Sequence, residues 1–243
     1  MTNIKKISQF ITLASFLCCS TMASAQKAGD LIFSVGAAYI KPNASLGPLS
    51  STSPTFTSVL NGATASISGI STMTLGGLYM FTDQIAAEVT IGIPPKMTVD
   101  MVAPGAVALG QPTSHPGAAS AKEFNPSIVA KYMFNNPGDN FRPYVGLGVT
   151  NTTFQSVTAN TSDATVALLA GTSASLSSAT APIYNAGVIY NIDAKWSING
   201  SVSYVPIKTD VTFVGAGQGA GVTTQGTLTL NPWDYVIRVG YKF

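Results

Sequence analysis

Short segments in which apolar side chains alternate with small or polar ones recur along this chain from Leu31 to its last residue. The final segment shows the pattern clearly, since every second residue from Trp233 to Phe243 is apolar or aromatic and the charged residues fall between them. A period of two residues is typical of a β-strand whose two faces meet different surroundings. The same pattern recurs at residues 31–39, 75–81, 85–93, 124–134, 141–149, 184–190 and 196–204, which predicts about eight strands.

The low charge of the chain indicates what surrounds those strands. Only 9% of the residues are charged, against about a quarter in typical soluble proteins. The second face of each segment carries Gly, Ser, Ala, Thr and Asn rather than the Lys and Glu of a soluble sandwich. We therefore expect an all-β fold, an eight-stranded antiparallel transmembrane up-and-down β-barrel in the outer membrane of a Gram-negative bacterium. A soluble all-β domain is the alternative interpretation.

Aromatic residues and connection lengths fit the same architecture. The expected aromatic girdle, at the ends of the strands, comprises Tyr39, Phe81, Phe134, Trp196, Tyr204, Trp233 and Phe243. The short polar turns are residues 82–84, 135–140 and 191–195, and the long connections are residues 41–66, 94–122, 156–181 and 214–225. Short turns belong on the periplasmic side of such barrels, so both termini are expected there, with outer-membrane lipids around the barrel. We expect the long connections to be loops that are mobile or fold over the barrel mouth.

Residues 1–25 have the features of a cleaved secretory signal peptide. Lys5 and Lys6 precede a mostly apolar run at residues 7–19, and Ala23-Ser24-Ala25 forms a small-residue cleavage site. The alternative, an uncleaved helical anchor, would need a longer apolar stretch. Residues 26–243 are then the barrel, and because both cysteines precede the cut, the mature chain offers no disulfide or thiolate.

The residue content argues against nucleic-acid binding and catalysis. A net charge of +2, with scattered Lys and Arg, gives no basic patch for nucleic acid. His115 is the only histidine, and it lies in a Pro- and Gly-rich stretch with no carboxylate close in sequence. We expect it to be an exposed loop residue, and we expect no catalytic residue, no metal site and no cofactor.

The phase of the alternation places several polar residues on inward faces. The charged set is Glu88, Lys131, Arg142, Asp234 and Arg238, and the small or polar set is Thr90, Ser201 and Ser203. Buried charges persist when they are paired or hydrated, which leaves two interpretations. The charges pair across the lumen and plug it, or they border a pore.

Four stretches resemble the OmpW family of small outer-membrane barrels: residues 74–94, 141–154, 186–204 and 230–243. The combination is specific, with FRPYVGLGVTNTTF at Phe141 and LNPWDYVIRVGYKF at the end of the chain. The resemblance implies an eight-stranded barrel with a mostly apolar lumen that passes small hydrophobic molecules inward. Thr90 and Ser203 stand where relatives can carry bulkier apolar residues, so a constriction there would be looser. A terminal aromatic such as Phe243 is, in many barrel families, a signal to the outer-membrane assembly machinery.

These features favour a porin-like channel for passive uptake of small, mainly hydrophobic molecules. The ligand would leave through the lumen or sideways between strands, and apolar loop residues would line the outer mouth. The candidates for that mouth are Leu46, Leu49, Leu60, Leu168 and Leu169. The alternative function is a closed structural or adhesion barrel that acts through its extracellular loops. The sequence leaves the oligomeric state open.

Overall fold

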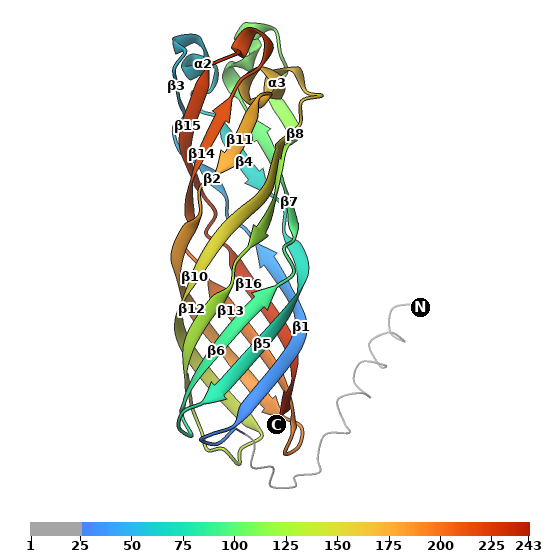
Figure 1. Ribbon diagram of the computed structural model, residues 1–243, viewed down its shortest axis with the longest axis vertical. Coiled ribbons are helices and arrows are strands. Elements are labelled where there is room, and N and C mark those ends of the chain that lie inside the picture. The colour runs from blue at the N-terminus through green and yellow to red at the C-terminus, as the bar shows by residue number, and fades with distance from the viewer. Residues whose placement is uncertain (1–25) are drawn as a thin grey trace, which may run out of the picture.

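The computed structural model describes residues 26–243, so the predicted signal peptide lies outside the described residues. Eight strands form a closed antiparallel barrel, in which β10 pairs with β12 to complete the circle (Figure 1). They are β1 (Leu31–Lys41), β5 (Ile70–Met80), β6 (Ile85–Gly92), β9 (Ser127–Met133), β10 (Phe141–Ala159), β12 (Ala179–Asn191), β13 (Trp196–Tyr204) and β16 (Trp233–Lys242). Each strand pairs with the next barrel strand in the chain, and β16 returns to β1, so the expected up-and-down barrel is confirmed.

The barrel is apolar outside and polar inside. Ile237 and Leu147 point outward with 61% and 60% of their surface exposed, whereas Arg142 and Arg238 point inward and are 0% and 5% exposed. An exterior of large apolar side chains around a polar interior is the arrangement that a lipid-bathed barrel requires. No helix in residues 26–243 has the length and apolar character needed to cross a membrane.

Aromatic side chains gather near both ends of the apolar exterior. At the end that holds the C-terminus, Phe81, Phe134 and Trp196 pack edge-to-face against Tyr79, Tyr132 and Tyr241, and Phe243 packs against Phe33. Toward the other end, Tyr39 packs near Tyr235, and Tyr204 packs near Tyr184 and Trp233. The seven residues of the expected girdle therefore divide between these two levels.

The connections at the two ends differ in length, as expected. The turns after β5, β9 and β12 are short and lie at the same end as the C-terminus (Figure 1). Asp193 shapes one of them, because its carboxylate accepts hydrogen bonds of 2.7 Å from the backbone N–H groups of Lys195 and Trp196.

The expectation that the long connections are loops is wrong for most of their length. They form an ordered extension of the barrel, drawn above it in Figure 1. Its strands are β2 (Ser45–Leu46), β3 (Ser50–Ser51), β4 (Thr64–Ile67), β7 (Lys96–Val102), β8 (Ser114–Phe124), β11 (Ser173–Leu176), β14 (Lys208–Val214) and β15 (Thr223–Thr229). Its helices are α2 (Pro54–Val59), η2 (Pro104–Leu109), α3 (Ala164–Ala170) and η3 (Gly217–Gly219). These segments become ordered because they bury apolar side chains against one another.

The expected strand over residues 124–134 is also divided. Phe124 ends β8 in the extension and Ser127 begins β9 in the barrel. Pro126 lies between them, and because proline has no backbone N–H it cannot donate to a continuous ladder. The chain therefore changes partners at this point, since β8 pairs with the upper half of β10 and β9 pairs with the lower half.

Candidate functional site

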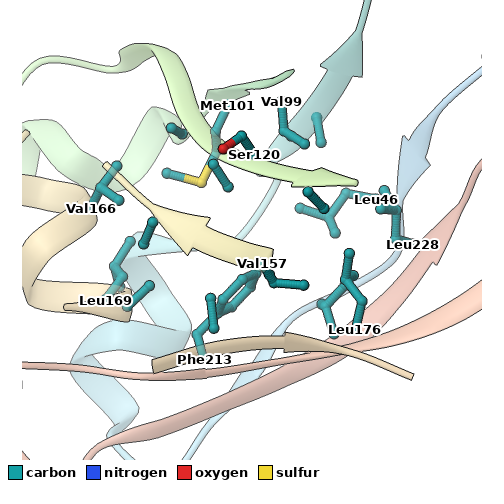
Figure 2. A pocket seen from close by; sticks show the side chains of 18 of the residues that line it. Leu46, Val99, Met101, Ser120, Val157, Val166, Leu169, Leu176, Phe213 and Leu228 are labelled. Atoms are coloured by element: carbon teal, nitrogen blue, oxygen red, sulfur yellow. The ribbon is translucent and has the colours of Figure 1, made fainter. Parts of the chain in front are cut away.

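An apolar cavity of about 90 Å³ lies inside the extension. Side chains from α3, from the sheet of β2, β11, β14 and β15, and from β4, β7, β8 and β10 surround it. Ser120 is the only polar residue among the twenty that line it (Figure 2). Of the five leucines expected at the mouth, Leu46, Leu49, Leu60 and Leu169 line this cavity. Leu168 does not line it but packs, partly buried, against the same apolar cluster. A dry, apolar surface of this kind binds apolar molecules.

Helix α3 covers one side of this cavity with Val166, Leu169 and Ala170. The carboxylate of Asp163 caps the helix by accepting from the Val166 N–H at 3.1 Å. Its other oxygen lies 2.8 Å from Nδ1 of His115. The hydrogen bond between Asp163 and His115 therefore fixes the start of α3 to β8.

The prediction that His115 is an exposed loop residue is wrong. His115 is 0% exposed and lies in β8, and its carboxylate partner comes from a segment 48 residues further along the chain. Burial tends to raise the pKa of Asp163, but the hydrogen bonds from His115 and the Val166 backbone hold that pKa below its usual value. Nε2 of His115 is buried without a hydrogen-bond partner in the described part of the chain.

A layer of apolar side chains closes the lower side of the cavity. Ala181, Ile207 and Leu230 are 2%, 0% and 2% exposed and line neither this cavity nor the one below it. We call these three residues the septum. They belong to one apolar cluster that reaches from Leu169 in the extension to Val129 in the barrel. A molecule in the apolar cavity is thus separated from the barrel lumen by packed side chains.

A second cavity, of about 80 Å³, lies in the lumen below the septum and has mixed walls. Apolar residues such as Ile40, Ile93 and Val129 alternate there with hydroxyl, amide and charged groups. Six of the eight residues expected to face the lumen line it: Glu88, Thr90, Ser201, Ser203, Asp234 and Arg238. The lumen is therefore less apolar here than the family resemblance implies.

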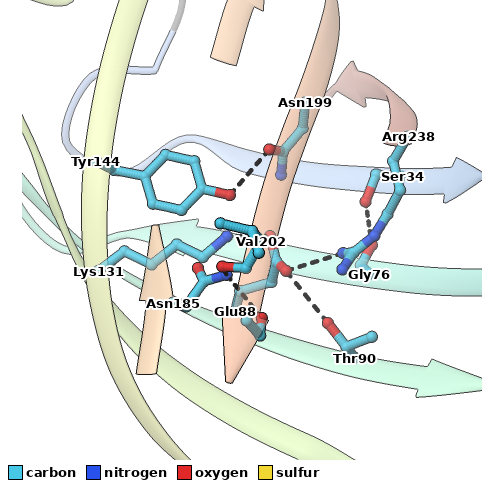
Figure 3. Close-up of polar contacts among 11 residues, drawn as sticks. Ser34, Gly76, Glu88, Thr90, Lys131, Tyr144, Asn185, Asn199, Val202 and Arg238 are labelled. Carbon is cyan, nitrogen blue, oxygen red and sulfur yellow. Dashed lines mark hydrogen bonds and ion pairs between the residues drawn. The ribbon is translucent and has the colours of Figure 1, made fainter. Parts of the chain in front are cut away.

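Ion pairs cross the lumen beside this cavity. The two carboxylate oxygens of Glu88 each lie 2.8 Å from a cation, one from Nζ of Lys131 and the other from Nη1 of Arg238 (Figure 3). All three side chains are at most 6% exposed. Thr90 donates to the same carboxylate at 3.1 Å. This pairing joins β6, β9 and β16 across the barrel interior, as the plug interpretation requires.

Below the ion pairs, side chains fill the barrel. Lys131 lies 4.2 Å from the ring centre of Tyr144, whose hydroxyl donates to Asn199 at 2.9 Å. Under this layer, Arg142 donates to the carbonyl oxygens of Gln26 and Asp83. Packed around them are Ile32, Leu78, Met80, Ala86, Met133 and Ile189. We call this layer the floor, and its side chains Arg142, Tyr144 and Met133 are 0–2% exposed and line neither of the two cavities described above.

Asp234 differs from the other inward charges because it has no ion pair among the described residues. It lies opposite Ser203, and its Oδ1 is buried without a hydrogen-bond partner there. Glu123, which sequence reasoning missed, is 2% exposed in β8 and close enough to interact electrostatically with Asp234. The alternation of β8 would have marked Glu123 as inward only if that segment had been recognised as a separate strand.

Most of the charged groups of the site are engaged with other groups of the protein. Within residues 26–243, no group of three or more His, Cys, Asp or Glu residues has the arrangement of a metal site. The inward cations are already engaged by carboxylates or carbonyl groups. What the site offers to a ligand is an apolar cavity, a septum and a mixed lumen cavity in series.

Comparisons with known proteins agree with this architecture. A family model described as "OmpW family" matches residues 27–243. Outer membrane protein W of Vibrio cholerae is 29% identical over 220 residues, which cover 90% of this chain and 91% of the relative. Outer membrane protein AlkL of Ectopseudomonas oleovorans is 25% identical over 184 residues, covering 76% and 71% of the two chains. The crystal structure of OprG from Pseudomonas aeruginosa superposes with a TM-score of 0.78 at 25% identity and covers 90% of this chain and 98% of that one.

Proposed function

This chain belongs to the OmpW family of outer-membrane barrels, and from that premise we propose that it is a channel for passive uptake of small, mainly hydrophobic molecules. The observation that carries the proposal is the cavity in the extension, whose twenty lining residues are all apolar except Ser120, and the hydroxyl of Ser120 bonds to exposed Thr158 on the outer surface. Binding there is favoured by about 25 cal/mol for each Å² of apolar surface that the solute removes from water. No energy source is part of the proposal, so transport follows the concentration gradient.

We further propose that the extension faces the cell exterior and the termini face the periplasm. Short periplasmic turns and longer extracellular segments are the rule for bacterial barrels. In that orientation, solutes from outside meet the apolar cavity first.

Because side chains fill the floor, we propose that solutes leave sideways through the barrel wall. Either exit requires the three side chains of the septum to move, but a route down the lumen would in addition have to displace Arg142, Tyr144 and Met133, which are 0–2% exposed. The wall of the lumen cavity includes Ile93, Pro95 and Asn125, at the point where the β6–β9 ladder ends with the pair Thr90–Ser127. Because proline interrupts strand pairing at this seam, we propose that solutes leave the barrel there.

Uptake of an apolar fluorescent probe by proteoliposomes tests the channel. Val157 lines the apolar cavity and its neighbour Thr158 is exposed, so V157W fills the cavity while T158W adds the same ring outside it. We expect V157W to slow uptake at least tenfold and T158W to leave it unchanged. Equal rates for the two variants would refute passage through this cavity.

A second variant separates the two exits. Tyr144→Ala opens the floor, which would speed a route along the lumen but leave a sideways route unchanged. We expect unchanged uptake of the apolar probe. Faster uptake would show that solutes pass the floor.

The closed structural or adhesion barrel is the second candidate function, and the filled floor favours it. It predicts that neither V157W nor Tyr144→Ala alters uptake, because wild-type proteoliposomes would take up the probe no faster than protein-free ones.

A further inference from the structure

A row of polar side chains crosses three strands on the outer surface of the extension. Lys96 of β7 lies directly opposite Lys122 of β8, and Lys122 lies directly opposite Gln155 of β10. All three side chains are exposed. We call these residues the basic row.

The charges of the basic row are not compensated by the protein. Neither lysine forms an ion pair within residues 26–243. Glu123 is adjacent to Lys122 but faces inward and is 2% exposed. Asp100 lies further up β7, where it accepts a hydrogen bond of 2.7 Å from the Gly117 N–H. Like charges directly opposite each other destabilise a sheet, so this pair weakens the fold unless an anion joins it.

The height of the basic row fits the polar zone just outside the membrane. On β10, Val149 is the last large apolar residue that is exposed, and Gln155 lies six residues further along the same strand. With a rise of about 3.3 Å per residue and a tilt of about 40°, the row lies about 15 Å beyond Val149. A phospholipid headgroup layer is about 5–8 Å thick, so the row suits a larger headgroup.

The next rung of the sheet carries hydroxyl groups. Ser120 lies opposite both Thr98 and Thr158, and its Oγ is 2.9 Å from Oγ1 of Thr158. Two ammonium groups beside a set of hydroxyls match a phosphate attached to a sugar, because ammonium groups pair with phosphate and hydroxyls exchange hydrogen bonds with a saccharide.

We propose that the basic row binds a phosphate of a phosphorylated saccharide headgroup carried by lipids of the surrounding leaflet. Side chains directly opposite each other in a sheet have Cβ atoms about 5 Å apart, so both ammonium groups reach one phosphate. The bound phosphate removes the repulsion between Lys96 and Lys122. This binding anchors the extension to the membrane surface and does not depend on what the channel carries.

Native mass spectrometry of the refolded full chain in detergent tests the proposal, with bisphosphorylated lipid A as the probe. We expect the wild type to retain lipid A and K96Q/K122Q to bind it at least tenfold more weakly. K208Q is the matched control, because Lys208 is also exposed in the extension but lies opposite Thr229 rather than a second lysine. Equal binding by K96Q/K122Q and the wild type would overturn the proposal.

Three further measurements test whether the basic row recognises the lipid-borne phosphate itself. Fully dephosphorylated lipid A should not be retained, and retention equal to that of the phosphorylated form would show that the acyl chains alone bind. Inorganic phosphate at millimolar concentration should not displace the lipid, and displacement would identify a free-anion site instead. K122E should raise the unfolding temperature without lipid, by replacing repulsion with an ion pair, and still abolish lipid A binding. A K122E variant that retained lipid A like the wild type would also contradict the proposal.

Discussion

The barrel and the extension are both built from antiparallel strands, but the barrel turns the polar faces of its strands inward and the extension turns its apolar faces inward. In the barrel, Glu88 and Lys131 point into the lumen and Leu147 points outward. In the extension, Val157 points toward an apolar cavity and Thr158 is exposed. The solvent explains the difference, because lipid surrounds the barrel and water surrounds the extension.

Strand β10 contains both arrangements. Its outward residues change from Leu147 and Val149 in the barrel to Asn151 and Gln155 above it. Its inward residues change from Arg142 and Tyr144 to Phe154. The register shifts between Gln155 and Thr158, and Ser156 has a positive φ of 50°, so a bulge marks the upper part of this change. Polarity therefore reverses within one continuous strand, and this reversal locates the edge of the membrane.

Breaking the ion pairs of the lumen should have the largest effect. Glu88→Gln leaves Lys131 and Arg238 buried without their shared carboxylate, and we expect it to lower the free energy of unfolding by about 3–5 kcal/mol. Urea unfolding in lipid vesicles measures this. D210N is the control, since Asp210 is exposed in the extension and its loss should change stability by about 0.5 kcal/mol or less. A similar result for both variants would mean that the lumen charges do not hold the barrel together.

One substitution placed in each environment sharpens the comparison. Leu230→Ala, in the septum, removes a buried side chain and leaves a cavity, which should cost about 3 kcal/mol. Leu147→Ala, on the lipid-facing surface, leaves no cavity because lipid chains fill the space, and should cost about 1 kcal/mol. The same unfolding experiment compares the two. A larger loss for Leu147→Ala would contradict the assignment of that surface to lipid.

The contact between His115 and Asp163 is expected to hold helix α3 in place over the apolar cavity, and removing it tests this. His115→Ala removes the contact that fixes the start of α3. We expect it to lower the local stability of the helix by about 1 kcal/mol and so to make the helix more mobile. A nitroxide attached through A164C reports helix mobility by electron paramagnetic resonance. Unchanged mobility in the His115→Ala background would show that apolar packing alone holds α3.

The nitroxide at position 164 also measures how the mobility of α3 depends on pH. Because the pKa of Asp163 is depressed in the folded protein, its contribution is fully present above the ordinary pKa of 3.8 and is lost as the pH falls through the folded value. Helix mobility should thus rise only below about pH 4 in the wild type, and Asp163→Asn should show that mobility at every pH.

The barrel was predictable from the sequence because its signal is local. In β16, the alternation from Trp233 to Phe243 assigns each side chain to a face without knowledge of any partner. The extension lacks such a signal. In β14, Lys208, Thr209, Asp210 and Thr212 leave only short apolar stretches, and the strand becomes evident only when it pairs with β11 and β15. Pairing between distant segments decides the structure there.

The distance between partners in the chain also explains why some site residues were predicted from the sequence and others were not. The inward phase of Glu88, Lys131 and Arg238 follows from each strand alone, although which of them pair does not. His115 and Asp163 are 48 residues apart on segments with no clear alternation, so neither the burial of His115 nor its contact was predictable.

The smallest effect is expected at the opposite end from the extension, in the turn between β12 and β13. The Asp193 carboxylate accepts from the Lys195 and Trp196 backbone N–H groups, and these bonds hold its pKa below the usual value. At pH values above 4, D193N should therefore have a slightly lower unfolding temperature than the wild type. Below pH 4 the wild-type carboxyl becomes protonated, so the unfolding temperatures of the two proteins should converge. Thermal unfolding followed by circular dichroism at pH 7 and pH 3 measures the difference. Because the turn is exposed to water, a loss of unfolding temperature at pH 7 larger than that of His115→Ala, measured in the same way, would show that the short turns contribute more to the barrel than their exposure implies.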